Sequence, residues 1–157
     1  MSDPTADHGA GAPAEDYLCS RIRRAEQALM GHHEAVLRGH GLTMTQYTVL
    51  LALSAEPDLS GAQLARACGV TQQTMATVLT GLHRKDLVAR TPSPVHAKVL
   101  LTSLTGTGRT ALERAYQEVI VLERALTDAF APAEHAALCA LLERATSVLA
   151  EQTPRRR

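Results

Sequence analysis

Aromatic residues are scarce in this sequence, which holds no Trp, one Phe and three Tyr among 157 residues. Leu, Ala and Val must therefore fill any core, and this favours packed helices over sheets. The sequence has neither a signal peptide nor an apolar run of about 18 residues, the length that marks a membrane helix. We expect a cytoplasmic protein without a membrane partner, whose 45% hydrophobic content suffices for one domain with a core.

Cysteine and histidine are present but poorly placed for metal binding. Cys19, Cys68 and Cys139 are widely spaced and form no CxxC pair, so we expect a reduced protein. His32 and His33 are neighbours that would point about 100° apart on a helix, a poor arrangement for zinc. Seven histidines keep a metal site open as an alternative, but we expect no metal and no other cofactor.

No residue pattern points to an enzyme. The Gly106, Thr107 and Gly108 segment superficially suggests a phosphate loop, but it lacks the glycine spacing and the Lys of a nucleotide site. Helix capping explains it better. The spacing places no carboxylate pair and no Ser, His and Asp set around one pocket, so we expect no enzymatic activity.

The segment from Ser60 to Leu104 carries the strongest local signals. Ser60 with Gln63 forms a capping box that starts a helix. Gly69 supplies a left-handed turn, and Thr71 can cap a second helix. Apolar residues recur in that helix at helical period, at Met75, Val78, Leu79 and Leu82. A capped helix, a tight turn and a second helix predict a helix-turn-helix.

The outer face of the second helix is polar, and a helix held this way fits the DNA major groove. Gln pairs bidentately with adenine, whereas Thr either donates a hydrogen bond or contacts a thymine methyl group. The candidates for base reading are Gln72, Gln73, Thr74 and Thr77. The alternative is an amphipathic helix with an ordinary polar face, which the hairpin that follows makes less favoured.

A hairpin and a local excess of positive charge complete the segment. Residues 87–91 and 98–104 are strand-like and are separated by Pro92, Ser93 and Pro94, so they predict a wing. Between Leu59 and Leu112 lie six basic residues and one acidic residue, a net charge of +5, although the whole chain is neutral. This predicts double-stranded DNA as a partner rather than a winged helix that binds only proteins. The candidates for DNA backbone contacts are Ser60, Thr71, Arg84, Lys85, Arg90, His96 and Lys98.

The remaining segments predict long helices around this lobe. Residues 1–14 read as a disordered tail and residues 153–157 as a basic tail, around a single domain of residues 15–152. Within it, residues 42–104 form the winged lobe, while residues 15–38 and 105–152 form helices with more apolar surface than the lobe can cover. The predicted fold is mainly α with a small β-wing, and its terminal helices are expected to join a second copy. A self-contained helical subdomain is the alternative.

The chain resembles the MarR family of bacterial transcriptional regulators across about residues 15–149. The residues that carry the resemblance, in order, are Leu42, Thr43, Gln46, Tyr47, Leu64, Ala65, Val70 to Thr74, Leu87, Val88, Arg90, Leu104, Thr105 and Gly108. The resemblance implies an obligate homodimer with two winged lobes on a pseudo-palindromic operator. It also implies a small-molecule effector, as yet unknown, whose binding usually relieves repression.

The chain also departs from this family. Wings of the family commonly carry Asp-Arg-Arg near the tip, where this chain has His96, Ala97 and Lys98. Thr77 and Gly81 stand where the family often has arginine, and Asp86 stands where a glycine usually closes the reading helix. Cys19 occupies a position similar to the reactive cysteine of members that sense organic hydroperoxides, so an oxidant sensor using Cys19 is an alternative function. The supporting tyrosines of those members would fall at Arg23 and His33.

Overall fold

The structure is a computed structural model that describes residues 17–96 and 98–152. The predicted tails, residues 1–14 and 153–157, and the wing residue Ala97 lie outside the described residues. The chain divides into two compact units, Met1–Ala115 and Tyr116–Arg157, which are considered separately below.

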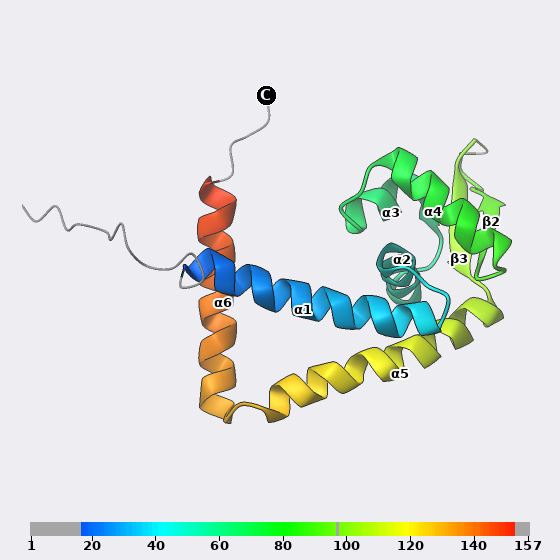
Figure 1. The fold of residues 1–157 in the computed structure, drawn as a ribbon. Coiled ribbons are helices and arrows are strands. Elements are labelled where there is room, and N and C mark those ends of the chain that lie inside the picture. The colour runs from blue at the N-terminus through cyan, green and yellow to red at the C-terminus, as the bar shows by residue number, and fades with distance from the viewer. Residues whose placement is uncertain (1–16, 97, 153–157) are drawn as a thin grey trace, which may run out of the picture. The chain divides into compact units, whose positions relative to one another are not determined.

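The described residues form helices and one small antiparallel sheet (Figure 1). The elements, in chain order, are α1 (Leu18–Gly39), α2 (Met44–Ala55), β1 (Leu59–Ser60), α3 (Gly61–Ala67), α4 (Gln72–Arg84), β2 (Val88–Pro92), β3 (Leu100–Leu104), α5 (Gly106–Asp128) and α6 (Pro132–Gln152). The fold class predicted from the sequence, mainly α with a small β-wing, is confirmed. The division between the two units falls within α5.

Two details of the elements differ from the prediction. The first helix begins at Leu18 rather than near residue 15, because Tyr17 is extended and its carbonyl accepts from Ser20 N at 2.9 Å. The sheet has a third strand, β1, which the sequence pattern did not predict. Leu59 and Ser60 pair with Thr102 and Leu101, so that β3 lies between β1 and β2.

Helix caps hold the lobe elements in place, and those at Ser60 and Thr71 are the ones that the sequence predicts. The capping boxes of Thr43 with Gln46 and of Ser60 with Gln63 are both present. At the other end of the helices, α1, α3 and α4 each end in a Schellman turn, closed by a residue at positive φ. That residue is Gly41 (φ 66°), Gly69 (φ 65°) or Asp86 (φ 57°). Asp86 thus takes the left-handed position usually given to glycine.

The core of the first unit lies where α1, α2, α3, α4 and the sheet meet. Its most buried large side chains come from all of these elements: Leu37, Leu50, Leu64, Met75, Leu79, Leu82 and Val88. Leu112 and Ala115 add the first turns of α5 to this core. Among them, Met75, Leu79 and Leu82 belong to the apolar stripe that the sequence predicted, and their packing fixes α4 on the body of the lobe.

In the second unit, α6 buries none of its residues. Its large apolar side chains are 37–53% exposed: Leu138, Leu141, Leu142, Val148 and Leu149. In the first unit, Tyr17 and Leu18 at the start of α1 are 53% and 68% exposed. Among the described residues, both terminal helices therefore expose large apolar side chains.

Candidate nucleic-acid interface

The helix α4 is presented by a short turn after α3. Gly69 closes α3 in the left-handed conformation, and Val70 N donates to Ala65 O at 3.0 Å. Thr71 then caps α4, since its Oγ1 accepts from Thr74 N at 3.1 Å. Met75, Leu79 and Leu82 of α4 are at most 1% exposed and face the core. The opposite side of α4 is consequently directed outward.

All four predicted base-reading residues are exposed: Gln72, Gln73, Thr74 and Thr77. The threonine hydroxyl groups are already engaged within the helix. Thr77 Oγ1 donates to Gln73 O at 3.3 Å, and Thr74 Oγ1 lies 2.9 Å from Thr71 Oγ1. These threonines can therefore offer a methyl group and a hydroxyl acceptor to a ligand, while Gln72 and Gln73 supply both donors and acceptors.

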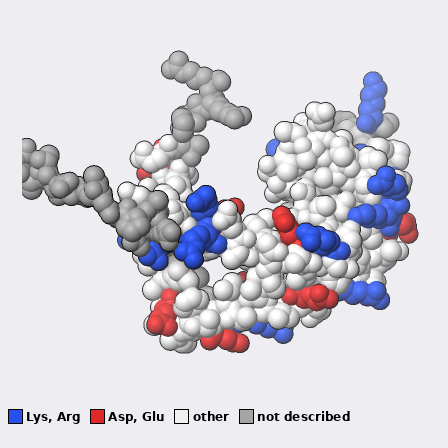
Figure 2. Space-filling model, in the orientation of Figure 1, with Lys and Arg blue, Asp and Glu red and all other residues white. Residues whose placement is uncertain are grey.

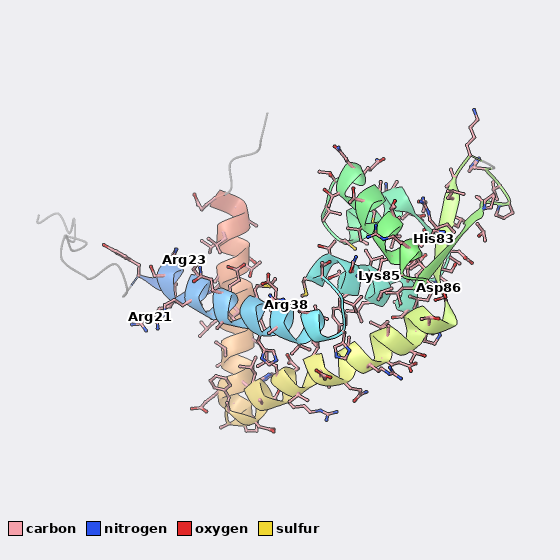
Figure 3. The ribbon with its side chains drawn as sticks, turned by 45° about the vertical axis from the view of Figure 1, so that its right-hand side comes forward. Arg21, Arg23, Arg38, His83, Lys85 and Asp86 are labelled. Atoms are coloured by element: carbon pink, nitrogen blue, oxygen red, sulfur yellow. The ribbon has the colours of Figure 1, made fainter. Side chains whose placement is uncertain are left out.

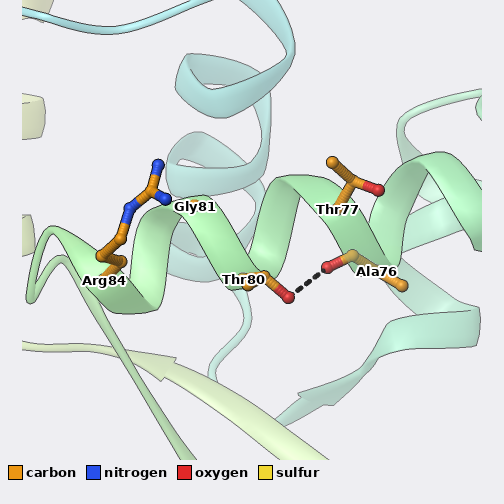
Figure 4. A pocket seen from close by; sticks show the side chains of 5 residues that line it. All are labelled: Ala76, Thr77, Thr80, Gly81 and Arg84. Atoms are coloured by element: carbon orange, nitrogen blue, oxygen red, sulfur yellow. Dashed lines mark hydrogen bonds between the residues drawn. The ribbon is translucent and has the colours of Figure 1, made fainter.

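A shallow groove runs along the C-terminal half of this face (Figure 4). Its volume is about 350 Å³, and its lining residues are Ala76, Thr77, Thr80, Gly81 and Arg84. Thr80 Oγ1 donates to Ala76 O at 2.9 Å, so the hydroxyl of this residue is also bound to the helix. The groove is thus lined by small and methyl-bearing side chains, with the Arg84 guanidinium at one end.

The predicted backbone contacts on the wing differ in their exposure. Lys98 and His96 are exposed, and the loop between them and β2 is held by Ser93 Oγ, which accepts from His96 N at 3.3 Å. Arg90, by contrast, is half-buried. It pairs across the sheet with Thr102, which is 0% exposed. Among the described residues, Arg90 Nε and Thr102 Oγ1 are buried without a hydrogen-bond partner. Lys98 is therefore better presented to a phosphate than Arg90.

Two predicted backbone contacts, Ser60 and Thr71, are the N-cap residues of α3 and α4. Their hydroxyl groups already accept backbone N–H groups, from Gln63 N at 3.3 Å and Thr74 N at 3.1 Å. Both residues are placed at helix N-termini, where backbone amides favour a bound anion. Their location agrees with a phosphate contact made chiefly by the backbone of these turns.

Lys85 is exposed, but its ammonium group is bound to two acceptors of the first unit. Its Nζ donates to Gly41 O at 2.6 Å and to Gln46 Oε1 at 3.0 Å, and so ties the end of α4 to the turn between α1 and α2. Figure 3 shows Lys85 beside His83 and Asp86 at this end of the helix. The predicted backbone contact Lys85 thus also holds the end of α4 on this turn. No local pattern could have revealed this role, because the acceptors lie 44 and 39 residues away in the chain.

The charged surface of the first unit agrees with this arrangement. Figure 2 shows Lys and Arg side chains on the wing side of the lobe. Within residues 59–112, Asp86 is the one acidic residue, and its carboxylate lies at the end of α4, where Thr107 Oγ1 donates to it at 3.4 Å. The positive charge predicted from the sequence is thus carried by the same lobe that presents α4.

The cysteines differ in their surroundings. Cys19 and Cys139 are exposed, and Cys139 Sγ lies 3.9 Å from His135 Nδ1. Burial raises the pKa of the Cys68 thiol, which keeps it protonated and poorly nucleophilic. Within residues 17–96 and 98–152, no three His, Cys, Asp or Glu side chains gather as metal ligands would. In the same part of the chain, no helix is both long and apolar enough to span a membrane.

A capped helix held across another, followed by a basic β-hairpin, defines a winged helix-turn-helix DNA-binding protein. The sequence profile of the MarR family matches residues 40–98. An HTH-type transcriptional repressor of Mycobacterium tuberculosis is 39% identical over 94 residues, which cover 60% of this chain and 68% of that protein. The chain belongs to the MarR family of transcriptional regulators.

Other relatives share more of the chain at lower identity. The homoprotocatechuate degradative operon repressor of Escherichia coli is 27% identical over 129 residues, 82% of this chain and 86% of that protein. The structure of the transcriptional repressor CouR bound to a 23-mer DNA duplex matches with a TM-score of 0.75 and 26% identity, over 84% of this chain and 94% of CouR. The regulator PcaV of Streptomyces coelicolor, solved with its natural ligand, matches with a TM-score of 0.70 and 25% identity, over 88% of this chain and 98% of PcaV.

Proposed function

We propose that this protein is a homodimeric repressor that inserts α4 into the major groove of an operator and leaves it when a small-molecule effector binds. The observation that carries the proposal is the outward face of α4, which is exposed, free of acidic residues and fixed on a buried core. The relatives support it: CouR was solved on a DNA duplex and PcaV with its natural ligand.

Side-chain chemistry distinguishes the residues of the lobe that read bases from those that hold phosphates. Gln73 offers a donor and an acceptor that match adenine, and Thr77 offers a methyl group that matches the C5-methyl of thymine. Arginine, the usual partner of guanine, is absent from α4 until its last residue, Arg84. We therefore expect α4 to read A·T pairs, while Arg84 and the exposed wing residue Lys98 hold phosphates.

A second copy of the chain is proposed as the partner of the terminal helices. α6 exposes Leu138, Leu141, Leu142, Val148 and Leu149, and the start of α1 exposes Tyr17 and Leu18. Exposed apolar side chains that cluster in this way typically mark an interaction surface. A symmetric dimer would cover them and would present two lobes to a pseudo-palindromic site. The positions of these helices in the dimer remain part of the proposal.

The test compares one reading residue with one anchoring residue. The operator is first obtained by selecting bound fragments from the protein's own genome without any ligand. Gln73→Ala should then cost about 1 to 3 kcal/mol on the operator and little on a scrambled duplex, since it removes a base-specific pair. Lys98→Ala should weaken binding to both duplexes alike.

Salt titrations make the distinction quantitative. Lys98→Ala should reduce the slope of log affinity against log salt by about 0.9 for each phosphate that is no longer neutralised, because fewer condensed counterions are released. Gln73→Ala should leave that slope unchanged, so each variant is the control for the other. The docking geometry is wrong if Gln73→Ala lowers both affinities equally while Lys98→Ala changes neither affinity nor slope. A wild-type protein without salt-dependent DNA binding would instead favour a winged helix that binds proteins.

A further inference from the structure

The end of α4 is joined to the turn between α1 and α2 by a small hydrogen-bonded junction. Gln46, on the first turn of α2, is 9% exposed. Its Oε1 accepts from Lys85 Nζ at 3.0 Å and from Thr43 N at 3.2 Å. Lys85 Nζ also donates to Gly41 O at 2.6 Å. One ammonium group therefore connects the C-cap of α4 to the residue that closes α1.

The backbone on both sides of this junction is tightly defined. Gly41 occupies the left-handed position of its Schellman turn, with Leu42 N donating to Leu37 O at 2.9 Å. Asp86, directly after Lys85, occupies the same position at the end of α4, with Leu87 N donating to Leu82 O at 3.0 Å. Because hydrogen bonds hold the backbone of both turns, the contacts of Lys85 hold the end of α4 at a defined position relative to α1 and α2.

Gly81 belongs to the same contact, one helical turn before Lys85. A Cβ atom on Gly81 would lie 3.2 Å from Gln46 Nε2, tighter than an ordinary contact. Glycine at this position costs helix stability of about 1 kcal/mol relative to alanine. The packing explains why a glycine stands at this position. It leaves room for the buried side-chain amide of Gln46, whose oxygen accepts the hydrogen bond from Lys85.

We propose that Lys85 is a positioning residue, which sets how α4 meets base edges by holding the end of the helix on Gly41 and Gln46. The proposal rests on the proposed function, since it concerns DNA reading. Two of the three donors of the exposed Lys85 ammonium are used by Gly41 O and Gln46 Oε1, which leaves one donor for a phosphate. A misplaced reading helix loses base-specific contacts before it loses general attraction to phosphates.

The experiment compares Lys85→Met with Arg84→Met, the neighbouring exposed cation, on operator and scrambled duplexes. Lys85→Met should weaken operator binding by about fivefold, in the range expected for one charge-assisted hydrogen bond near the surface. Its affinity for scrambled DNA should change by less than about twofold, and its salt slope should stay that of the wild type. Arg84→Met should lower both affinities and reduce the salt slope by about 0.9 for each phosphate that is no longer neutralised.

Substitutions at Gln46 separate the junction from the charge of Lys85. Gln46→Met removes the acceptor but leaves the ammonium, so it should reproduce the operator-specific loss of Lys85→Met. Gln46→Glu keeps an acceptor for both Lys85 and Thr43, because Glu also completes a capping box, and it should retain wild-type discrimination. The double variant Lys85→Met with Gln46→Met should lose less than the sum of the single losses, since both remove one junction.

Thermal unfolding of each variant shows whether the folded fraction, rather than the position of α4, has changed. The affinities of Lys85→Met are corrected for the fraction of folded protein. If their ratio, operator to scrambled duplex, is then the same as in the wild type, the proposal is overturned. A salt slope that falls in Lys85→Met as it does in Arg84→Met would also overturn it, because that result makes Lys85 a phosphate contact. If the wild type itself does not bind DNA, the proposed function fails and this inference fails with it. If the wild type binds DNA but Lys85→Met gives one of the two contrary results, only this inference fails.

Discussion

Gly108 offers the sharpest test of how the start of α5 packs against the start of the wing. A Cβ atom at this position would lie 1.9 Å from Leu87 O and 2.8 Å from Leu87 C, whereas real Cβ contacts do not fall below 3.0 Å. Gly108→Ala therefore forces the start of α5 and the start of the wing apart by about 1 Å. Leu87 O also accepts from Thr105 N at 3.2 Å, and this hydrogen bond would be strained by the same movement.

The expected cost is large for a single methyl group. Overpacking of this kind costs about 1 to 3 kcal/mol, and a weakened hydrogen bond adds about 1 kcal/mol. The higher helix propensity of alanine offsets less than about 1 kcal/mol of this destabilisation. We therefore expect Gly108→Ala to lower the free energy of unfolding by about 1 to 3 kcal/mol.

Urea unfolding followed by far-ultraviolet circular dichroism measures this difference. Protein concentration must be the same for all variants, because self-association would add to apparent stability. Gly106→Ala is the matched control, since Gly106 lies in the same turn of α5 and a Cβ there meets nothing within 4 Å. It should be neutral or slightly stabilising. Equal unfolding midpoints for the two variants would show that the close approach of Gly108 to Leu87 does not exist in solution.

Three further predictions concern assembly, base preference and oxidation. Sedimentation at micromolar concentration should give a dimer of the 16.8 kDa chain, and a species of monomer mass alone would refute the proposed role of the exposed α6 leucines. Thr77→Val keeps the methyl surface and should keep operator affinity, whereas uracil in place of thymine at the read positions should cost about 0.8 kcal/mol per contacted methyl group; unchanged binding to the uracil operator would exclude methyl reading. If the exposed Cys19 senses oxidants, Cys19→Ser should abolish peroxide-induced release from DNA, and unchanged release in that variant would assign the response to another group.

Much of the lobe could be predicted from short stretches of sequence. Capping boxes, left-handed turn residues and helical apolar stripes each involve residues within about seven positions of one another, so their geometry is set locally. For this reason the caps at Ser60 and Thr71, the turn at Gly69 and the inward face of α4 appear in the structure as expected. The outward face of α4 followed from the same periodicity.

The roles of individual polar groups depended on contacts that no local pattern contains. β1 was missed because two residues carry no strand signal, and Leu59 becomes a strand residue only through pairing with Thr102. The sequence showed only the charge of Lys85, and its contacts could not be predicted because its acceptors Gly41 and Gln46 are distant in the chain. Gly108 looked like part of a helix cap, and only the approach of Leu87 O shows why a side chain does not fit. Tertiary packing decides such cases because it brings together groups whose hydrogen bonds and steric limits cannot be foreseen from either segment by itself.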